Sequence, residues 1–176
     1  MLKSATSFLA LSLIALQVIV AQTIQNGIYL IEDTNSGKFL GIGPTPFVYQ
    51  PIDTPVRLFD QSDRFVQYWR VEGATDGAVI ISAVRFSPPG YNIVTQGNYI
   101  FVSAKKEPQL LAVESAGEGE VVIKLPYQDK IFTSNPSINP GASDILLQPA
   151  QGLPYQRYRF VSVDLYHSSP FNVQES

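Results

Sequence analysis

A repeated pair of markers is the feature of this sequence that most restricts its fold. A glutamine stands two residues before a bulky apolar residue that closes an apolar run at Gln67–Trp69, Gln109–Leu111 and Gln156–Tyr158. A second marker, Gly-x-apolar-x-Ile, recurs in step with the first at 27–31, 77–81 and 119–123. Two markers that return together every ~40 to 50 residues indicate three copies of one supersecondary unit.

Each unit contains short apolar runs that are separated by Gly, Pro, Asn and Asp, a pattern typical of strands, and no long helical period appears. Four strands in each of three units give the count of a β-trefoil, in which six strands close a barrel and three hairpins cap one end. We therefore predict an all-β chain, a β-trefoil of twelve strands in three pseudo-repeats. The predicted strands are 28–32, 38–42, 56–60, 66–72, 78–84, 91–95, 99–104, 109–115, 120–125, 130–134, 144–147 and 158–163.

The three marker glutamines have a structural interpretation. Buried polar side chains usually satisfy nearby hydrogen-bonding groups, so we expect these amides to bond to the backbone rather than to a ligand. Trp69 is likewise expected in the core.

The N-terminus has the features of a secretory signal. Lys3 precedes an apolar run from 8 to 20, broken only by Ser12 and Gln17, and Ala21 is a small residue suited to cleavage. A membrane anchor is the alternative, but it needs roughly 20 apolar residues. We predict a signal peptide at 1–21 and one domain at 22–176. We expect this domain to be secreted to the extracellular space and not to associate with a membrane after the signal is cleaved.

Composition limits the partners and the chemistry. There is no cysteine, so the domain must be stable without disulfides. The net charge is −3, and Lys105-Lys106 is the one adjacent basic pair, which we expect on a solvated turn, so no nucleic-acid partner is expected. His167 is the single histidine, and no nucleophile motif or zinc-ligand spacing occurs. We expect no enzyme, no cofactor and no metal.

Carboxylates are plentiful enough for a two-carboxylate glycosidase to be considered. Glu114, Glu118 and Glu120 are instead interpreted as solvated turn charges.

Several segments together carry a family resemblance: NGIYLI at 26–31, WRVE at 69–72, QGNYIF at 96–101, EPQLLAV at 107–113 and YRFVSV at 158–163. The chain resembles the β-trefoil serine protease inhibitors of mushroom-forming fungi, the cospin type. The resemblance implies a fungal inhibitor that acts on a serine endopeptidase through a surface loop. Nothing in the sequence demands a dimer, so we expect a monomer.

In that family the reactive loop lies between the second and third strands of the first unit, which corresponds to 41–55 here. This segment has no Lys, Arg or Asn, whereas the family loop carries polar or charged residues near its start. We therefore expect Phe47 or Tyr49 to occupy the apolar specificity pocket of a chymotrypsin-type protease. Alternatively, these two aromatic side chains could fold back over the mouth of the barrel. The predicted inhibitory residues are Gly43, Pro44, Pro46, Phe47, Val48, Tyr49 and Gln50.

Other readings stay open. Lys105 and Lys106, or Asn135 and Asn139, mark second candidate loops, and the lysines would suit trypsin. Gln-x-Trp also marks carbohydrate-binding trefoil lectins, but only the first of the three copies has Trp. Inhibition of cysteine proteases by the same fold is the third possibility.

Overall fold

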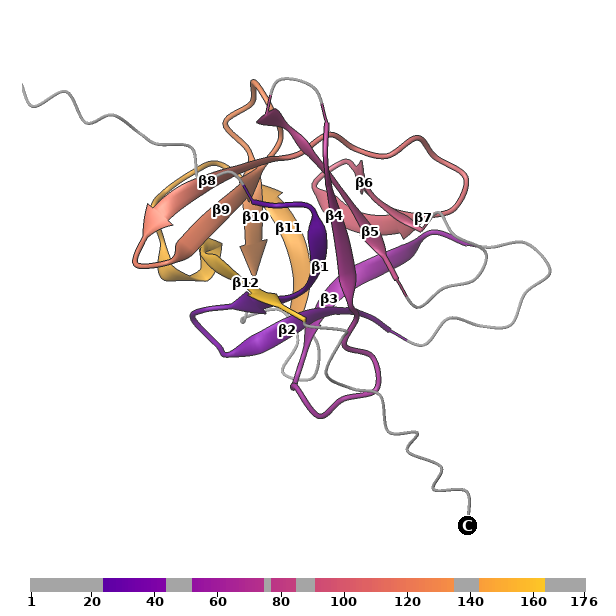
Figure 1. The fold of residues 1–176 in the computed structure, drawn as a ribbon. Coiled ribbons are helices and arrows are strands. Elements are labelled where there is room, and N and C mark those ends of the chain that lie inside the picture. The colour runs from indigo at the N-terminus through magenta and orange to yellow at the C-terminus, as the bar shows by residue number, and fades with distance from the viewer. Residues whose placement is uncertain (1–23, 44–51, 75–76, 85–90, 135–142, 164–176) are drawn as a thin grey trace, which may run out of the picture.

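The protein is described by a computed structural model at residues 24–43, 52–74, 77–84, 91–134 and 143–163. It is an all-β protein, as predicted, with the strands joined in one antiparallel sheet (Figure 1). No helix among these residues is long and apolar enough to cross a membrane. The elements are β1 Gly27–Asp33, β2 Lys38–Ile42, β3 Thr54–Phe59, β4 Trp69–Gly73, β5 Val79–Ala83, β6 Asn92–Gln96, β7 Tyr99–Ser103, β8 Ala112–Gly117, β9 Glu120–Lys124, β10 Ile131–Ser134, β11 Ser143–Gln148, the short 3-10 helix η2 Pro154–Gln156 and β12 Tyr158–Ser162.

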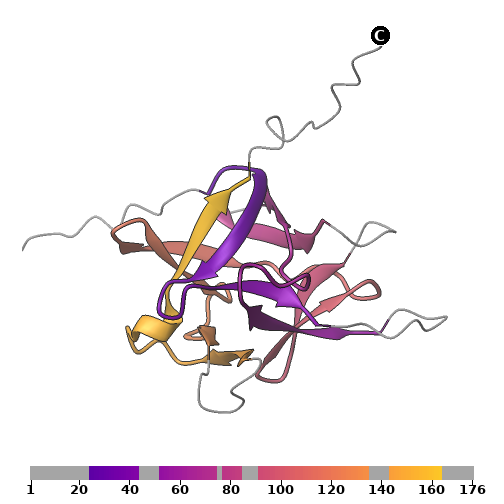
Figure 2. The same cartoon turned by 90° about the horizontal axis from the view of Figure 1, so that it is seen from below.

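The strand pairing recurs in threes. The longest ladders outside the hairpins join the units to one another, as β12–β1, β4–β5 and β8–β9. Figure 2 shows the last strand, β12 in yellow, running alongside the first, β1 in indigo. Shorter contacts join the first and last strands of each unit, as β1–β4, β9–β12 and the bridge between Val79 and Leu111. These pairings link six strands into a circuit, which the isolated Val79–Leu111 bridge closes just before β8 begins.

The remaining six strands are three hairpins, β2–β3, β6–β7 and β10–β11. The hairpins also pair with one another, through β3–β7, β7–β11 and β11–β3. Each of these kinds of pairing thus occurs three times among the described strands.

The markers also locate the core. Each Gly-x-apolar-x-Ile segment leads into β1, β5 or β9, and its isoleucine is buried, as is the bulky residue after each glutamine. Together they occupy corresponding positions in the core: Ile31, Ile81, Ile123, Trp69, Leu111 and Tyr158. The indole Nε1 of Trp69 donates to the Leu40 carbonyl at 3.1 Å, which confirms its core role.

Strand existence was predicted better than strand limits. Each of the twelve predicted runs overlaps a strand, and β12 begins at Tyr158 as predicted. The runs 66–72 and 109–115 start too early, because Trp69 begins β4 and Leu111 directly precedes β8. Gln67 and Gln109 therefore lie in irregular segments before these strands, and Gln156 ends the short helix η2. An apolar run alone cannot separate a strand from a buried turn that leads into it.

Candidate functional site

The connection between β2 and β3 is the predicted inhibitory loop. Gly43, at its start, is buried. The other predicted loop residues lie outside the described part of the chain, as do Asn135 and Asn139 of the second candidate loops: Pro44, Pro46, Phe47, Val48, Tyr49 and Gln50. The structure therefore describes the two ends of the predicted inhibitory loop, together with Lys105 and Lys106.

The first end of the loop is fixed by close backbone packing. The Ile42 amide donates to the Phe65 carbonyl at 3.0 Å, and Gly41 bridges Val66. A Cβ atom on Gly41 would lie 2.2 Å from the Phe65 carbonyl oxygen, so only glycine permits this approach. Phe59 and Phe65 pack beneath it with ring centroids 5.5 Å apart. The loop thus starts from a rigid base.

The second end is fixed by Asp53. Its Oδ2 accepts a hydrogen bond from Gln96 Nε2 at 2.5 Å and pairs with Lys106 Nζ at 2.9 Å. Desolvation opposes ionisation, but the hydrogen bonds from Ser103, Lys106 and Gln96 and the Lys106 charge hold the pKa of Asp53 below its usual value. Asp53 is therefore an ionised anchor that joins the β2–β3 connection to the β7–β8 turn.

The side chain of Ser103 stabilises the β7–β8 turn by hydrogen bonding to its backbone. Its hydroxyl is buried and accepts from the amides of Lys105 and Lys106, both at 3.2 Å. Lys105 and Lys106 are exposed, as expected for a solvated turn, and the Lys106 ammonium also forms the ion pair with Asp53.

The structure therefore brings two of the three candidate loops together. Sequence reasoning treated the 41–55 segment and the Lys105-Lys106 turn as alternatives. They meet because Thr54 and Pro55 of β3 pair with Val102 and Phe101 of β7. Gln96, Ser103 and Asp53 were missed as anchor residues, since no local spacing relates residues that far apart in the chain.

The marker glutamine of the third unit is confirmed as structural. Gln156 is fully buried and its amide makes four hydrogen bonds. The oxygen accepts from the amides of Gln151 and Leu153 at 2.9 and 3.4 Å. The nitrogen donates to Thr133 Oγ1 at 3.1 Å and to the Pro149 carbonyl at 2.9 Å. No hydrogen-bonding capacity is left for a ligand.

The acidic residues of the β8–β9 hairpin differ from expectation. Glu114 lies within β8 and pairs with Lys124 at 2.5 Å, and Glu120 begins β9 and pairs with Arg157 at 3.2 Å. Only Glu118 is an exposed turn residue. In the described segments, no group of three or more His, Cys, Asp or Glu side chains could hold a metal ion.

Comparisons with known proteins give structural likeness without sequence likeness. No protein-family model matches the sequence, and no curated protein matches it. Three similar solved structures cover most of the chain. A proteinase inhibitor from Coprinopsis cinerea has a TM-score of 0.65 at 15% identity, covering 80% of this chain and 99% of that one.

The agglutinin of Rhizoctonia solani has a TM-score of 0.63 at 15% identity, covering 80% of this chain and 97% of that one. The designed threefold symmetric protein ThreeFoil has a TM-score of 0.62 at 16% identity, covering 78% and 100%. All three are β-trefoil proteins, and none of the three is an enzyme. At such low identity the likeness shows the fold alone.

Proposed function

We propose that the chain is a secreted, monomeric β-trefoil of three pseudo-repeats that inhibits a serine endopeptidase through the β2–β3 connection. One observation carries the proposal: Asp53 ties the end of this connection to Gln96 and Lys106 at 2.5 and 2.9 Å. The structural likeness to a fungal proteinase inhibitor supports it at the level of fold.

The physical argument concerns the cost of docking. A protease cleft pairs with an extended segment and receives one side chain in a pocket. Binding is weakened by the entropy of ordering that segment. Both ends of the loop are held, at Gly41 and at Asp53, and the segment contains Pro44, Pro46 and Pro51. Fixed ends and restricted φ angles lower the ordering cost.

The choice of side chain follows from the target pocket. Phe47 or Tyr49 would fill an apolar pocket, and Lys105 or Lys106 would suit the acidic pocket of a trypsin-like enzyme. Use of Lys106 requires its pair with Asp53 to open, which costs about 0–1 kcal/mol for such a partly exposed pair. We assign the primary role to the aromatic residues of the β2–β3 connection.

The test is a panel of trypsin, chymotrypsin, elastase and subtilisin with standard substrates. We expect inhibition of chymotrypsin, and Phe47→Ala combined with Tyr49→Ala should weaken it by more than about tenfold, or ~1.4 kcal/mol. Tyr127→Ala is the matched control, because it removes an exposed aromatic ring at a different turn. Unchanged hydrolysis by all four enzymes would contradict the proposal.

The anchor can be tested separately. Asp53→Asn keeps the shape of the side chain but removes the charge that pairs with Lys106, so inhibition should weaken several-fold. Asp60→Asn is its control, since Asp60 pairs with Lys38 at 3.6 Å near the β1–β2 turn. Parallel assays with papain and legumain decide whether the target is a cysteine protease instead.

Export is the remaining part of the proposal. Mass spectrometry of the protein secreted by a fungal host should find a chain that begins at Gln22. A product that retains residues 1–21 would contradict cleavage at Ala21.

A further inference from the structure

Tyr127 has a backbone conformation that its side chain does not explain. The Gln128 amide donates to the Leu125 carbonyl at 3.3 Å, Pro126 is the second residue of this turn, and Tyr127 has φ of 60°. These are the features of a type II turn, whose third position normally takes glycine or asparagine. A bulky residue there is strained. The Tyr127 side chain is nevertheless 94% exposed, so burial in the chain does not offset this strain.

The exposed ring stands beside a groove. Tyr127, Pro126 and Leu110 line one side of a pocket of about 330 Å³, and Ala112 lies in its wall. A second pocket of about 300 Å³ shares Glu114 and Lys124 with the first and is lined in part by Ala116, Asp129 and Arg157. These volumes are at the lower end of those that hold small ligands.

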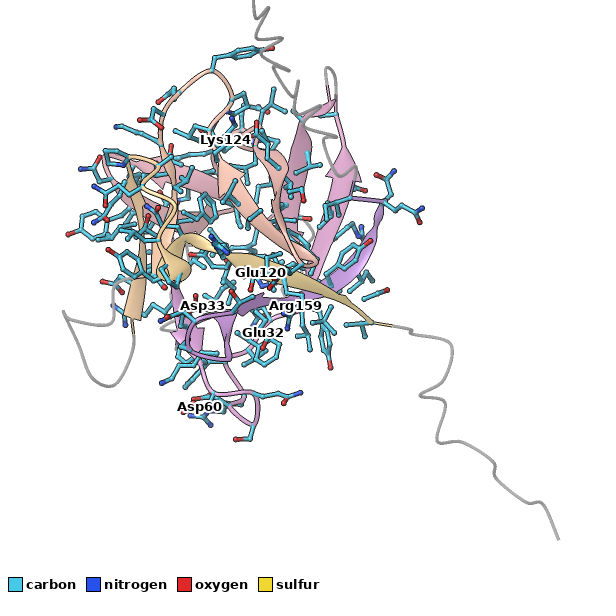
Figure 3. The ribbon with its side chains drawn as sticks, turned by 90° about the vertical axis from the view of Figure 1, so that its left-hand side faces the viewer. Glu32, Asp33, Asp60, Glu120, Lys124 and Arg159 are labelled. Carbon is cyan, nitrogen blue, oxygen red and sulfur yellow. The ribbon has the colours of Figure 1, made fainter. Side chains whose placement is uncertain are left out.

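The pair Lys124–Glu114 lies between the two pockets and lines both. Ala112 and Glu114 of β8 lie opposite Lys124 and Val122 of β9. The two alanines of β8, Ala112 and Ala116, leave open space on either side of the pair. Figure 3 shows Lys124 well apart from the labelled Glu32 and Arg159, on another part of the surface.

The charges of the groove select against an ionic ligand. Lys124 is paired with Glu114 at 2.5 Å, and Arg157 with Glu120 at 3.2 Å. A charged ligand would have to displace one of these partners. A hydroxyl group can instead donate to the carboxylate and accept from the ammonium without breaking the pair, because both ions keep unused hydrogen-bonding capacity. Two neighbouring hydroxyls on one ring fit such a pair well.

We propose that this groove, which runs from Tyr127 across the Lys124–Glu114 pair, binds a neutral glycan. A pyranose ring would place its C–H face on the Tyr127 ring and two adjacent hydroxyls on the ion pair. The apolar face and polar edge of a sugar match the amphipathic surface that an exposed tyrosine provides. This function is separate from protease inhibition, because none of these residues belongs to the β2–β3 connection.

An extended peptide would dock by adding a strand to an open sheet edge. β8 is the last strand in the order of the sheet and is paired with β9; the two backbone hydrogen bonds between Leu111 and Val79, at 2.7 and 2.9 Å, precede this strand. The two pockets are lined by the side chains of Glu114 and Lys124 rather than by a strand edge alone, so we assign them to a glycan that binds through side chains.

The first experiment is an array of neutral and charged glycans probed with the full secreted chain, followed by calorimetry with the strongest glycan. We expect a neutral glycan to bind. Failure of every glycan to bind, or preferential binding of sialylated or sulfated glycans, would overturn the proposal.

The decisive variant is Tyr127→Gly. Because glycine adopts a positive φ without strain, this variant should raise the unfolding midpoint in urea while it reduces glycan affinity by more than about tenfold. Tyr99→Ala, which removes a ring that is 49% exposed on β7, should leave affinity unchanged. A lower unfolding midpoint, or unchanged affinity, in Tyr127→Gly would overturn the proposal.

The ion pair is tested by Glu114→Gln with Lys124→Gln, which should weaken glycan binding by more than about fivefold, with inhibition of the protease unchanged. Glu32→Gln with Arg159→Gln is the matched control, because this pair at 3.3 Å also joins two adjacent strands on the surface. Equal effects of the two double variants on glycan affinity would overturn the assignment of the groove.

Discussion

Gln156 and Gln109 occupy the same place in the sequence repeat but have different surroundings. Gln156 is fully buried, and its amide makes all four of its hydrogen bonds. Gln109 is only half-buried; its oxygen accepts from Thr95 Oγ1 at 3.3 Å and its nitrogen donates to the adjacent Leu110 carbonyl at 3.2 Å. A repeated residue therefore fixes a position in the fold but does not fix its energetic contribution.

Gln67 is buried like Gln156, but its side-chain amide makes fewer hydrogen bonds than that of Gln156 or Gln109. Its nitrogen makes one long hydrogen bond, 3.4 Å to the Phe65 carbonyl, and its oxygen has no partner within the part of the chain that the structure describes. Burial of a polar group stabilises the fold only when its hydrogen bonds are made. The three glutamines thus form an internal series in which burial and hydrogen bonding vary separately.

The largest effect is expected for Gln156→Ala. Four hydrogen bonds at roughly 0.5–1.5 kcal/mol each, together with the groups left unpaired, give an expected loss of about 3 kcal/mol in the free energy of unfolding. Urea unfolding at neutral pH measures this loss. A loss below about 1 kcal/mol would break the comparison, because the saturated network would then contribute no more than a surface amide.

Asp33 extends the comparison to a buried charge with incomplete partners. One carboxylate oxygen accepts from Ser36 Oγ at 2.5 Å. The other has no hydrogen-bond partner among the described residues, and neither has the hydroxyl of Tyr158, the residue opposite Asp33 on β12. Burial raises the pKa of Asp33 above its usual value, although hydrogen bonds from Ser36 and Ser134 oppose the shift. The folded state therefore favours the protonated form.

This shift has a defined sign. The stabilising contribution of Asp33 is fully present below its unfolded pKa, about 3.9, and is lost as pH rises through the higher folded pKa. In Asp33→Asn this part of the pH dependence should disappear, an effect smaller than that of Gln156→Ala. Urea unfolding from pH ~3 to ~7 tests it, with exposed Asp60→Asn as a control that keeps the wild-type slope. An unchanged slope in Asp33→Asn would contradict a raised pKa.

A smaller effect is expected for Gln67→Leu. The substitution removes an unpartnered buried oxygen and one long hydrogen bond, so the free energy of unfolding should change by less than about 1 kcal/mol. Chemical denaturation checks it. A loss as large as that of Gln156→Ala would mean that the Gln67 oxygen is satisfied in solution.

The smallest effect is expected for Gln109→Ala. One of its two hydrogen bonds is exposed and the other, to Thr95, is only part-buried, so water can largely replace them and we expect a loss below about 0.5 kcal/mol. Thermal unfolding monitored by circular dichroism would detect a larger change. Equal losses at positions 109 and 156 would show that the repeated sequence position, and not the local hydrogen bonding, sets the energy.

At the two surface sites, too, the sequence indicated where a residue lies along the chain but not which residue it contacts. The segment 41–55 was predicted as the loop between two strands, but its attachment to Lys106 through Asp53 was not. Glu114 was interpreted as a turn charge, although it lies in β8 and pairs with Lys124. Tyr127 gave no signal, because a positive φ at tyrosine cannot be inferred from residue order.

The sequence by itself determined the all-β secondary structure and the residues that fill the core, such as Ile31, Ile81 and Ile123. These follow from alternation and turn residues, which act over a few neighbouring positions. Only the tertiary structure decided which glutamine amide makes all of its hydrogen bonds, that Asp33 is buried opposite Tyr158, and that Asp53 forms an ion pair with Lys106. Hydrogen bonding and desolvation depend on atoms within a few ångströms, and here those atoms come from strands far apart in the chain.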